Sequence, residues 1–283
     1  GLNWIGTLSG LVCYNGDRWH TITAKNSTLP SEKILSVAVS DEKKYIGTTK
    51  GLLVIENDKW TVFNTKNSNL PSNKIRKIII KNTTVWIATS EGLVKHNDDF
   101  EVVLSGKKNG IIDDNFICMS VDHEDVVWLG TNNGLYNFKN NIWRVFNTKN
   151  SKLKNNQISN IAIDGQNRKW IGTKKGIAVI NDDASWAMFD KKNTPLKRNM
   201  IRSITYDDYD RVWVGTETEI VSFDGRSWKK HKKINKRAFV VSFFIDGFDN
   251  KWVSTSNNII VYNSEGVEFQ ENIDTNNSVV VIK

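Results

Sequence analysis

A short phrase recurs along the chain at a nearly fixed spacing, and this periodicity restricts the possible folds more than any other feature of the sequence. The phrase is an aromatic residue, an aliphatic residue, a small residue and Thr, and Gly-Leu follows it after a short gap in most copies. Its aromatic positions are Trp4, Tyr45, Trp86, Trp128, Trp170, Trp213 and Trp252, so the steps between them are 41, 41, 42, 42, 43 and 39 residues. A repeat of this length indicates a propeller or a stacked-repeat protein.

One repeat divides into four short strands. In the copy that spans residues 158–192, apolar runs rich in β-branched and aromatic residues alternate with turns rich in Gly, Asn and Asp. This pattern is typical of strands joined by hairpins, and it does not have the period of a helix. Four antiparallel strands in each repeat of about 40 residues, repeated radially, describe the blade of a β-propeller. We therefore predict an all-β fold without helices.

The two ends of the chain are complementary parts of one blade. Residues 3–8 have the pattern of a second strand with no first strand before them, and residues 278–283 have the pattern of a first strand with nothing after them. Pairing these ends completes a seventh blade and avoids exposed strand edges, which promote aggregation. We predict a single domain, residues 1–283, folded as a seven-bladed β-propeller with four antiparallel strands per blade. Its C-terminal strand joins the N-terminal blade and closes the ring.

Two positions of the repeat predict local geometry. The third residue of the phrase is Gly, Ala or Ser in every copy, which indicates close approach of a neighbouring blade. The following Gly, as at Gly10, lies in the hairpin between the second and third strands, where a positive φ is expected. Glu219 and Asn258 replace this Gly in the last two copies. Their divergence points to a specialised surface near the last two blades.

The composition limits the classes of function. No run approaches 18 apolar residues, so we expect no membrane span and no direct membrane insertion. Cys13 and Cys118 fall in different repeats and form neither a metal motif nor a disulfide framework, so we expect both to be small buried hydrophobes. The formal net charge of +8 favours acidic partners. Nucleic acid is not expected, because the basic residues are interleaved with Asp and Glu and no aromatic pair is available to stack bases.

The repeat and the loop after it resemble a known family. The run at residues 63–73, Phe-Asn-Thr-Lys-Asn-Ser-Asn-Leu-Pro-Ser-Asn, recurs in part at residues 25–31 and 146–151. Together with the Trp-Ile-Gly-Thr phrase, it resembles the two-component regulator propeller repeat over essentially the whole chain. The resemblance implies the periplasmic sensor part of a hybrid two-component histidine kinase, a class that often regulates polysaccharide use, or a free-standing secreted protein or lipoprotein.

The same resemblance implies a location and a type of partner. The location would be periplasmic, in the cell envelope or secreted, although no signal segment is visible in the sequence. Sensor proteins of this family usually carry a second propeller and a β-sandwich domain, and either of these would be a candidate partner. The resemblance supplies no binding residue, because ligand sites in the family are not fixed by the repeat motif.

The titratable residues argue against catalysis. The histidines fall in four different repeats, so an acid–base pair within hydrogen-bond reach is not expected; they are His20, His96, His123 and His231. We interpret the Asp-rich turns, such as residues 122–125, as carboxylates that cap turns rather than bind cations. We expect no catalytic residue, no metal and no cofactor, and we predict a non-enzymatic module that binds a ligand or a protein.

Two alternatives remain open. Streptogramin lyases are similar seven-bladed propellers that use a metal and a His/Glu pair near the channel. The innermost strands here have no His at the equivalent position, which disfavours a lyase-like enzyme; the residues there are Ser36, Lys77, Cys118, Asn160, Ser203 and Ser242. The second alternative is a pure scaffold that pairs with another propeller.

Basic residues recur in the long loops that lead into each innermost strand, and in a propeller these loops share one face. The candidate ligand-binding residues on this loop face and at the channel mouth are Lys25, Lys66, Lys74, Lys77, Lys107, Lys149, Lys192 and Arg202. Such a basic collar would suit an acidic oligosaccharide, such as a uronic or sulfated glycan. The competing interpretation is that Lys is a consensus residue of the repeat in a solvated loop.

Overall fold

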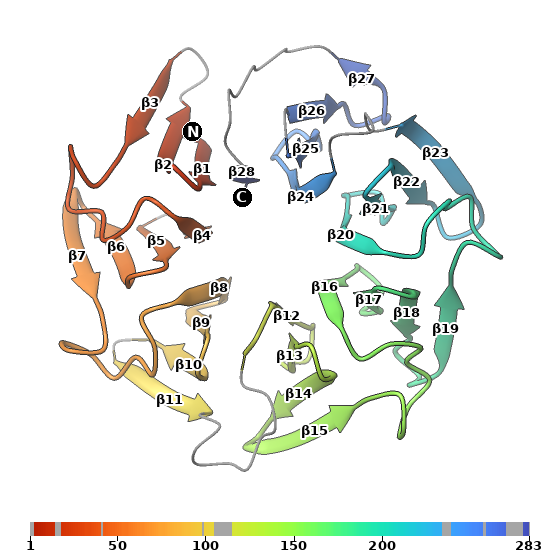
Figure 1. Ribbon diagram of the computed structural model, residues 1–283, viewed down its shortest axis with the longest axis horizontal. Coiled ribbons are helices and arrows are strands. Elements are labelled where there is room, and N and C mark those ends of the chain that lie inside the picture. The colour runs from red at the N-terminus through yellow and green to blue at the C-terminus, as the bar shows by residue number, and fades with distance from the viewer. Residues whose placement is uncertain are drawn as a thin grey trace. The chain divides into compact units, whose positions relative to one another are not determined.

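The computed structural model describes residues 3–14, 18–40, 42–97, 99–104, 115–233, 239–256, 259–269 and 280–282. Their regular elements are all β-strands, and seven four-stranded sheets account for every strand (Figure 1). The protein is a seven-bladed β-propeller, as predicted. None of the described residues belongs to a helix that could cross a membrane.

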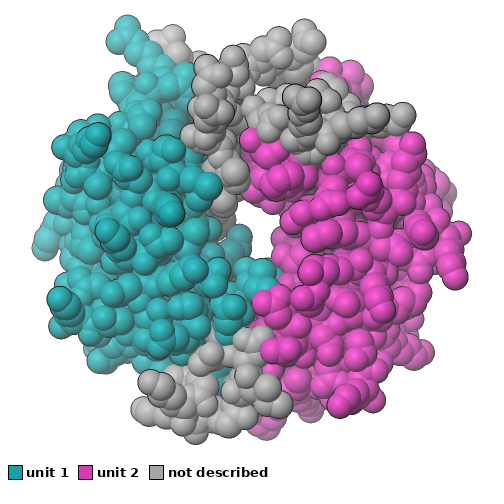
Figure 2. All heavy atoms as spheres, in the orientation of Figure 1, with its two compact units in different colours: residues 1–119, 280–283 teal, residues 120–279 magenta. Residues whose placement is uncertain are grey.

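The chain divides into two compact units, and Figure 2 colours them separately. Unit 1 consists of residues 1–119 and 280–283, and unit 2 of residues 120–279. The prediction of a single domain over the whole chain stays a prediction.

Unit 1 contains three blades with the strand orders β28-β1-β2-β3, β4-β5-β6-β7 and β8-β9-β10-β11. Their strands are β1 (Asn3–Thr7), β2 (Gly10–Tyr14), β3 (Trp19–Ile22), β4 (Ile34–Val39), β5 (Lys43–Thr48), β6 (Leu52–Glu56), β7 (Lys59–Phe63), β8 (Ile75–Lys81), β9 (Thr84–Thr89), β10 (Leu93–His96), β11 (Phe100–Leu104) and β28 (Val280–Ile282).

Unit 2 contains the blades β16-β17-β18-β19, β20-β21-β22-β23 and β24-β25-β26-β27, and all but the first residues of the blade β12-β13-β14-β15. Their strands are β12 (Cys118–Val121), β13 (Val127–Gly130), β14 (Leu135–Lys139), β15 (Ile142–Phe146), β16 (Ile158–Ile163), β17 (Lys169–Thr173), β18 (Gly176–Ile180), β19 (Trp186–Phe189), β20 (Ile201–Tyr206), β21 (Val212–Thr216), β22 (Glu219–Phe223), β23 (Trp228–Lys233), β24 (Val240–Ile245), β25 (Lys251–Thr255), β26 (Ile259–Tyr262) and β27 (Glu268–Phe269).

The C-terminal strand completes the first blade. β28 pairs antiparallel with β1, and Val281 lies opposite Gly6. The blade that the sequence divides between its two ends is therefore assembled, and the predicted pairing of the C-terminal strand with the N-terminal blade is confirmed.

Neighbouring blades within a unit meet at their first strands, so that β4 lies against β8 and β20 against β24 (Figure 1). The small third residue of the repeated phrase permits this approach. A Cβ atom added to Gly47 would lie 2.7 Å from Cγ2 of Ile75, and one added to Gly215 would lie 2.4 Å from Cγ1 of Val240. Both distances are shorter than any ordinary carbon contact, so the predicted reason for a small residue is confirmed at these positions.

The hairpin between the second and third strands explains the Thr and the second Gly of the repeat. In the second blade, Thr48 Oγ1 donates a hydrogen bond to the carbonyl oxygen of Gly51 over 2.8 Å and accepts one from the amide of Lys50 over 3.0 Å. Gly51 has a φ of 140°, and a Cβ atom added there would lie 2.6 Å from the carbonyl oxygen of Phe63. Gly10 has a φ of 139°, which confirms the predicted positive φ.

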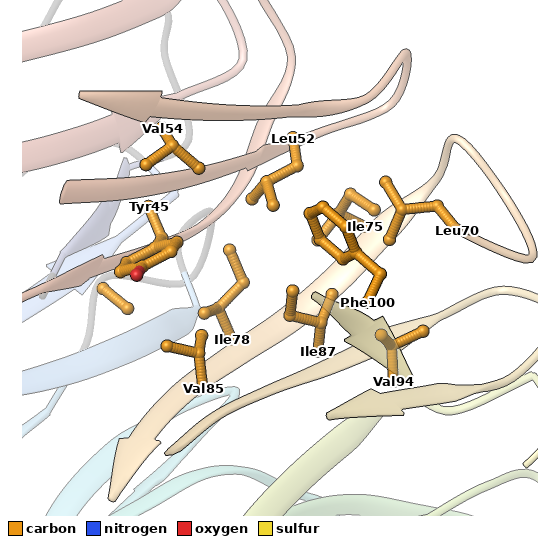
Figure 3. Close-up of a cluster of buried hydrophobic side chains, with 11 residues drawn as sticks. Tyr45, Leu52, Val54, Leu70, Ile75, Ile78, Val85, Ile87, Val94 and Phe100 are labelled. Carbon is orange, nitrogen blue, oxygen red and sulfur yellow. The ribbon is translucent and has the colours of Figure 1, made fainter. Parts of the chain in front are cut away.

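The apolar core lies between the blades. Figure 3 shows the cluster between the second and third blades, where Leu52, Ile75, Ile78 and Ile87 are fully buried. Burying each of these side chains contributes about 1.5–3 kcal/mol relative to leaving it in water. Cys13 and Cys118 are also buried, as their isolated positions predicted.

Aspartates, three of them buried and Asp246 half-buried, organise the turns between the first and second strands of unit 2. Asp164 Oδ1 accepts hydrogen bonds from the amides of Gln166 and Arg168, and its Oδ2 accepts one from the indole nitrogen of Trp170 over 2.7 Å. Asp122, Asp207 and Asp246 hold the tryptophan of their own blade in the same way, at 2.9 Å in each case. The interpretation of these aspartates as turn-capping residues is therefore confirmed.

The same turns are tied to one another across blades. The amide of His123 donates to Asn167 Oδ1 over 3.0 Å, and the amide of Gly165 donates to Asp210 Oδ1 over 2.7 Å. The amide of Asp208 donates to Asp249 Oδ1 over 3.1 Å. The accepting residues have φ values near 60°, a conformation that Asn and Asp adopt more readily than other residues with a Cβ. Three turns of unit 2, at residues 164–168, 207–211 and 246–250, therefore each satisfy a backbone donor of the blade before them.

Candidate functional site

The long loops between blades are held in shape by their own side chains. In the loop at residues 64–74, Asn67 Oδ1 accepts from the amide of Asn64 over 2.8 Å, and Asn67 Nδ2 donates to the carbonyl oxygen of Val62 over 2.9 Å. Ser68 Oγ donates to the carbonyl oxygen of Asn64 over 2.6 Å. The loop at residues 147–157 repeats these contacts. Both loops therefore hold the backbone of the lysine at their third position, Lys66 or Lys149, in a fixed conformation.

These loops lie at the same edge of the blades as the hairpins between second and third strands. In unit 1, the hydroxyls of Ser31 and Thr49 are 2.8 Å apart, as are those of Ser72 and Ser90. In unit 2, the amide of Lys197 donates to Glu219 Oε1. Within each unit, the loops and hairpins therefore form one loop face, as a propeller predicts.

Four of the predicted lysines lie exposed on the loop face of their unit. Lys25 and Lys66 belong to unit 1, and Lys149 and Lys192 belong to unit 2. All four side chains are exposed, and no described residue forms a salt bridge with any of them. Lys107 lies outside the described residues. The assembly of one collar from both units stays a prediction.

Lys74 directly precedes β8 and Lys77 lies within it, and both are half-buried. In other blades, the residue at the position of Lys77 bridges to the next blade. Ser36 Oγ accepts from the amide of Ile78 over 3.0 Å, and Asn160 Oδ1 accepts from the amide of Ile204 over 3.1 Å. A lysine cannot accept such a bond, and burial lowers the pKa of Lys77. The position is therefore a blade-to-blade link in the blades of Ser36 and Asn160, and it holds a half-buried lysine in the blade of Lys77.

Arg202 is the most constrained of the predicted residues. Its Nη2 donates to Glu217 Oε1 over 2.6 Å, and Arg198 Nη1 reaches Glu217 Oε2 over 3.4 Å. The guanidinium carbon of Arg202 lies 5.0 Å from the ring centre of Phe239, which is within cation–π range. The carboxylate offsets part of the charge of Arg202, so this residue offers a fixed, planar donor rather than a free cation.

The sequence interpretation missed Arg76, Glu217 and Phe239. Arg76 has the same position in β8 as Arg202 in β20, and its Nη2 donates to Asn115 Oδ1 over 2.7 Å. Burial lowers the pKa of Arg76, and its Nε has no partner among the described residues. Each arginine contacts a residue in the segment before the first strand of the next blade, Asn115 before β12 and Phe239 before β24. Aligning the second residue of every first strand would have shown the two arginines in register.

The histidines lie in separate blades. His20 and His231 lie on the fourth strands β3 and β23, His96 ends β10, and His123 lies in the turn before β13. His231 Nε2 is 2.8 Å from Ser222 Oγ, and its ring stacks on Trp213 with 4.3 Å between ring centres. No group of three or more His, Cys, Asp or Glu that could hold a metal occurs among the described residues.

Comparison with protein families and curated proteins gives one match. Residues 195–218 match the model of the two component regulator propeller family. This segment begins in a loop of the loop face, contains Arg198, Arg202 and Glu217, and includes β20 and β21. No curated protein matches the chain in sequence.

Solved structures share the fold at low sequence identity. Virginiamycin B lyase from Staphylococcus aureus aligns with a TM-score of 0.70 and 15% identity over 86% of this chain and 84% of that one. An extracellular domain assigned to a hybrid two component system of B. thetaiotaomicron aligns with a TM-score of 0.60 and 18% identity over 95% of this chain. The match covers 44% of that domain, so this chain spans less than half of its length.

A third similar structure is PorZ of Porphyromonas gingivalis, described as a surface component of the type-IX secretion system. It aligns with a TM-score of 0.64 and 14% identity over 93% of this chain and 45% of that one. At these identities, the three likenesses establish the propeller fold and leave the chemistry to the residues of this chain.

Proposed function

We propose, for a chain that carries the two component regulator propeller repeat, that it is a non-enzymatic binding module of an extracellular or periplasmic sensor. The repeat match and the likeness to an extracellular domain of a hybrid two component system support the sensor setting. A β-propeller suits this role because its blades form a rigid platform and its loops carry recognition.

The observation that supports this proposal most directly is the state of the loop-face lysines. Lys25, Lys66, Lys149 and Lys192 are exposed on loops fixed by internal hydrogen bonds, and no described residue pairs with their ammonium groups. A ligand with several negative charges would gain an ion pair at each lysine of a unit that it reaches, without disrupting an existing salt bridge. Their backbones are already ordered, which lowers the entropic cost of binding.

The ligand class that fits this face is an acidic oligosaccharide. Spaced carboxylates or sulfates along a glycan match the exposed lysines that recur in the loops of neighbouring blades, Lys25 and Lys66 in unit 1 and Lys149 and Lys192 in unit 2. Exposed ion pairs contribute little singly, about 0.2–1 kcal/mol each, so binding would depend on several loops and would weaken with salt. A protein partner, such as a second propeller or a β-sandwich domain, is the alternative, and the match to less than half of the extracellular domain supports it.

A lyase activity is the less favoured second candidate. Virginiamycin B lyase and this chain share the fold. Here the four histidines belong to different blades, so no two of them form an acid–base pair on one strand or on adjacent strands.

The proposal is tested by calorimetric titration with a tetragalacturonate, and with a neutral oligosaccharide of equal length as the reference ligand. We expect binding of the acidic ligand that weakens steeply between about 50 and 500 mM salt. Lys66→Ala and Lys149→Ala should each weaken it about twofold to fivefold, the loss of one exposed ion pair.

Lys59→Ala is the matched control. Lys59 is exposed on β7 at the opposite blade edge, so this substitution removes the same charge away from the loop face. Equal weakening by Lys59→Ala would mean that only net charge matters and would contradict a loop-face site. The absence of any tetragalacturonate binding would contradict the acidic glycan and leave the protein partner as the favoured ligand.

A further inference from the structure

A pocket of about 660 Å³ opens in unit 1 at the blade edge opposite the loop face. It lies between the second and third blades, and residues of the turn after β4 and of the turn after β8 line it. Tyr45 and Val85 contribute to its wall, and both also belong to the core cluster of Figure 3. Its volume falls within the range of small-molecule sites.

The pocket exists because two turns are short. In unit 2, residues 164–168, 207–211 and 246–250 connect first and second strands, and the first Asp of each turn accepts a hydrogen bond from the tryptophan of its blade. In unit 1, residues 40–42 connect β4 to β5, and Asn82 and Thr83 alone connect β8 to β9. The residues that cover the blade junction in unit 2 therefore have no counterpart here.

The aromatic residue of the second blade changes together with the turn. Tyr45 takes the place of the repeated tryptophan and has no indole N–H to bond a turn carboxylate. Its side chain is 4% exposed, yet no described residue forms a hydrogen bond with its hydroxyl. Burial raises the pKa of Tyr45, so the hydroxyl keeps its proton at neutral pH and remains a donor.

The rest of the lining is mostly polar and uncharged, and its two charged residues, Glu42 and Lys43, have opposite signs. Asn82, Thr83 and Asn97 are exposed at the rim, and no described residue pairs with their side chains. An amide presents a donor and an acceptor side by side, which matches neighbouring hydroxyl groups. Lys43 lies 3.2 Å from Glu56, so its charge is largely offset. Ile80 and Val85 supply an apolar wall against which C–H groups can pack.

We propose that this pocket, the turn pocket lined by Tyr45, Ile80, Asn82, Thr83, Val85 and Asn97, binds a neutral polyhydroxylated molecule of one or two rings, a saccharide unit or a cyclic polyol. The ring hydroxyls meet the amides and the Tyr45 hydroxyl, and an apolar ring face rests on Ile80 and Val85. This site is independent of the loop face and of its acidic ligand.

The test is saturation-transfer NMR with the intact chain and a set of probes: glucose, galactose, N-acetylglucosamine, maltose, cellobiose and myo-inositol, with glucuronate as the charged comparison. At least one neutral probe should bind with a Kd of about 1 mM, which is expected for a ligand of this size. Sugars and myo-inositol are separate arms that distinguish a saccharide from a polyol.

Two variants locate the binding. Thr83→Trp places a large side chain at the rim and should abolish the signal, and Tyr45→Phe removes only the hydroxyl and should weaken binding about fivefold. The matched controls are Thr65→Trp, on the loop face of the same unit, and Tyr206→Phe, at the end of β20 in unit 2. Both controls should bind as the wild type does.

The proposal is overturned if no neutral probe binds, if glucuronate binds and the neutral probes do not, or if Thr83→Trp binds as well as Thr65→Trp. Lys66→Ala, which tests the loop face, should leave the turn pocket unchanged. Failure of one site is therefore distinguishable from failure of the other.

Discussion

At the scale of single residues, Asp207 shows how one carboxylate holds a blade edge together. Its oxygens accept hydrogen bonds from the amide and Nε of Arg211 and from the indole of Trp213, and Lys251 Nζ lies 3.3 Å away. Burial alone would raise the pKa of Asp207, but the bonds from Trp213 and Arg211 and the nearby charges hold it below its ordinary value. The carboxylate is therefore ionised and fully paired.

We expect Asp207→Ala to lower the free energy of unfolding by about 3 kcal/mol, because Arg211 and Trp213 lose their acceptor and the fully buried Lys251 keeps only Asp249 as a counter-ion. Urea unfolding at neutral pH measures this change. Asp224→Ala is the control, since Asp224 caps an exposed turn of the same blade and its loss should cost much less. Equal effects of the two substitutions would contradict the role given to Asp207.

His231 predicts a pH dependence of stability. Burial, and then the charges of Lys229 and Arg211, lower its pKa from the ordinary 6.5 to about 4. The unfolded chain therefore binds a proton below pH 6.5 that the folded chain refuses until about pH 4, and stability falls as the pH falls through this window. We expect a loss of about 1–2 kcal/mol between pH 7.5 and 5.

Urea unfolding of the wild type and of His231→Phe at both pH values measures this loss. The substitution should remove most of the decline in that interval, because Phe keeps the stacking on Trp213 and cannot take up a proton. The aspartates with lowered pKa values lose their contribution only at lower pH, so they do not obscure the comparison. A decline of the same size in His231→Phe would refute this role.

At the scale of elements, the hairpin between second and third strands depends on a residue without a side chain. Gly51 combines a φ of 140° with a carbonyl oxygen where its Cβ would be, so Gly51→Ala should cost about 2–3 kcal/mol. Gly247→Ala is the control, because no atom lies within 4 Å of its added Cβ and its φ is not in the left-handed region. That substitution should change stability by less than about 1 kcal/mol, as thermal unfolding will show.

The sequence pattern of an element predicts its backbone conformation better than it predicts the partners of its charged side chains. The period, the alternation of apolar runs with turns, and the positions of Thr and Gly predict the four-stranded blade correctly, because each depends on contacts within the repeat itself. The lengths of the short turns near Tyr45 can also be read from the sequence. The pocket itself cannot, because it depends on whether side chains from elsewhere in the chain fill that space. The pairing of Arg202 with Glu217 could not be predicted, since it joins residues of different elements whose side chains have many rotamers.

At the scale of the whole molecule, the C-terminal strand makes the first blade depend on both ends of the chain. Val281→Pro removes a backbone donor from the middle of β28, opposite Gly6, and leaves β1 with an edge that can pair with other chains. We expect a loss of about 2–3 kcal/mol, a Tm lower by about 5–10 °C, and concentration-dependent association in light scattering.

Val281→Thr is the control, because it keeps the amide and the branched Cβ and should leave the Tm nearly unchanged. If Val281→Pro melts at the same temperature as Val281→Thr and remains monomeric, β28 contributes nothing to stability.

The antiparallel pairing of β1 and β28 also determines how the protein responds to mechanical load. Ile5 lies opposite Ile282 and Thr7 opposite Val280, so the first residues of the chain and the last ones leave this ladder at the same end. A force that pulls the two ends apart therefore acts on one hydrogen bond at a time, as in opening a zipper, and never shears the whole ladder at once. Tension applied through the termini would open this blade first, at low force.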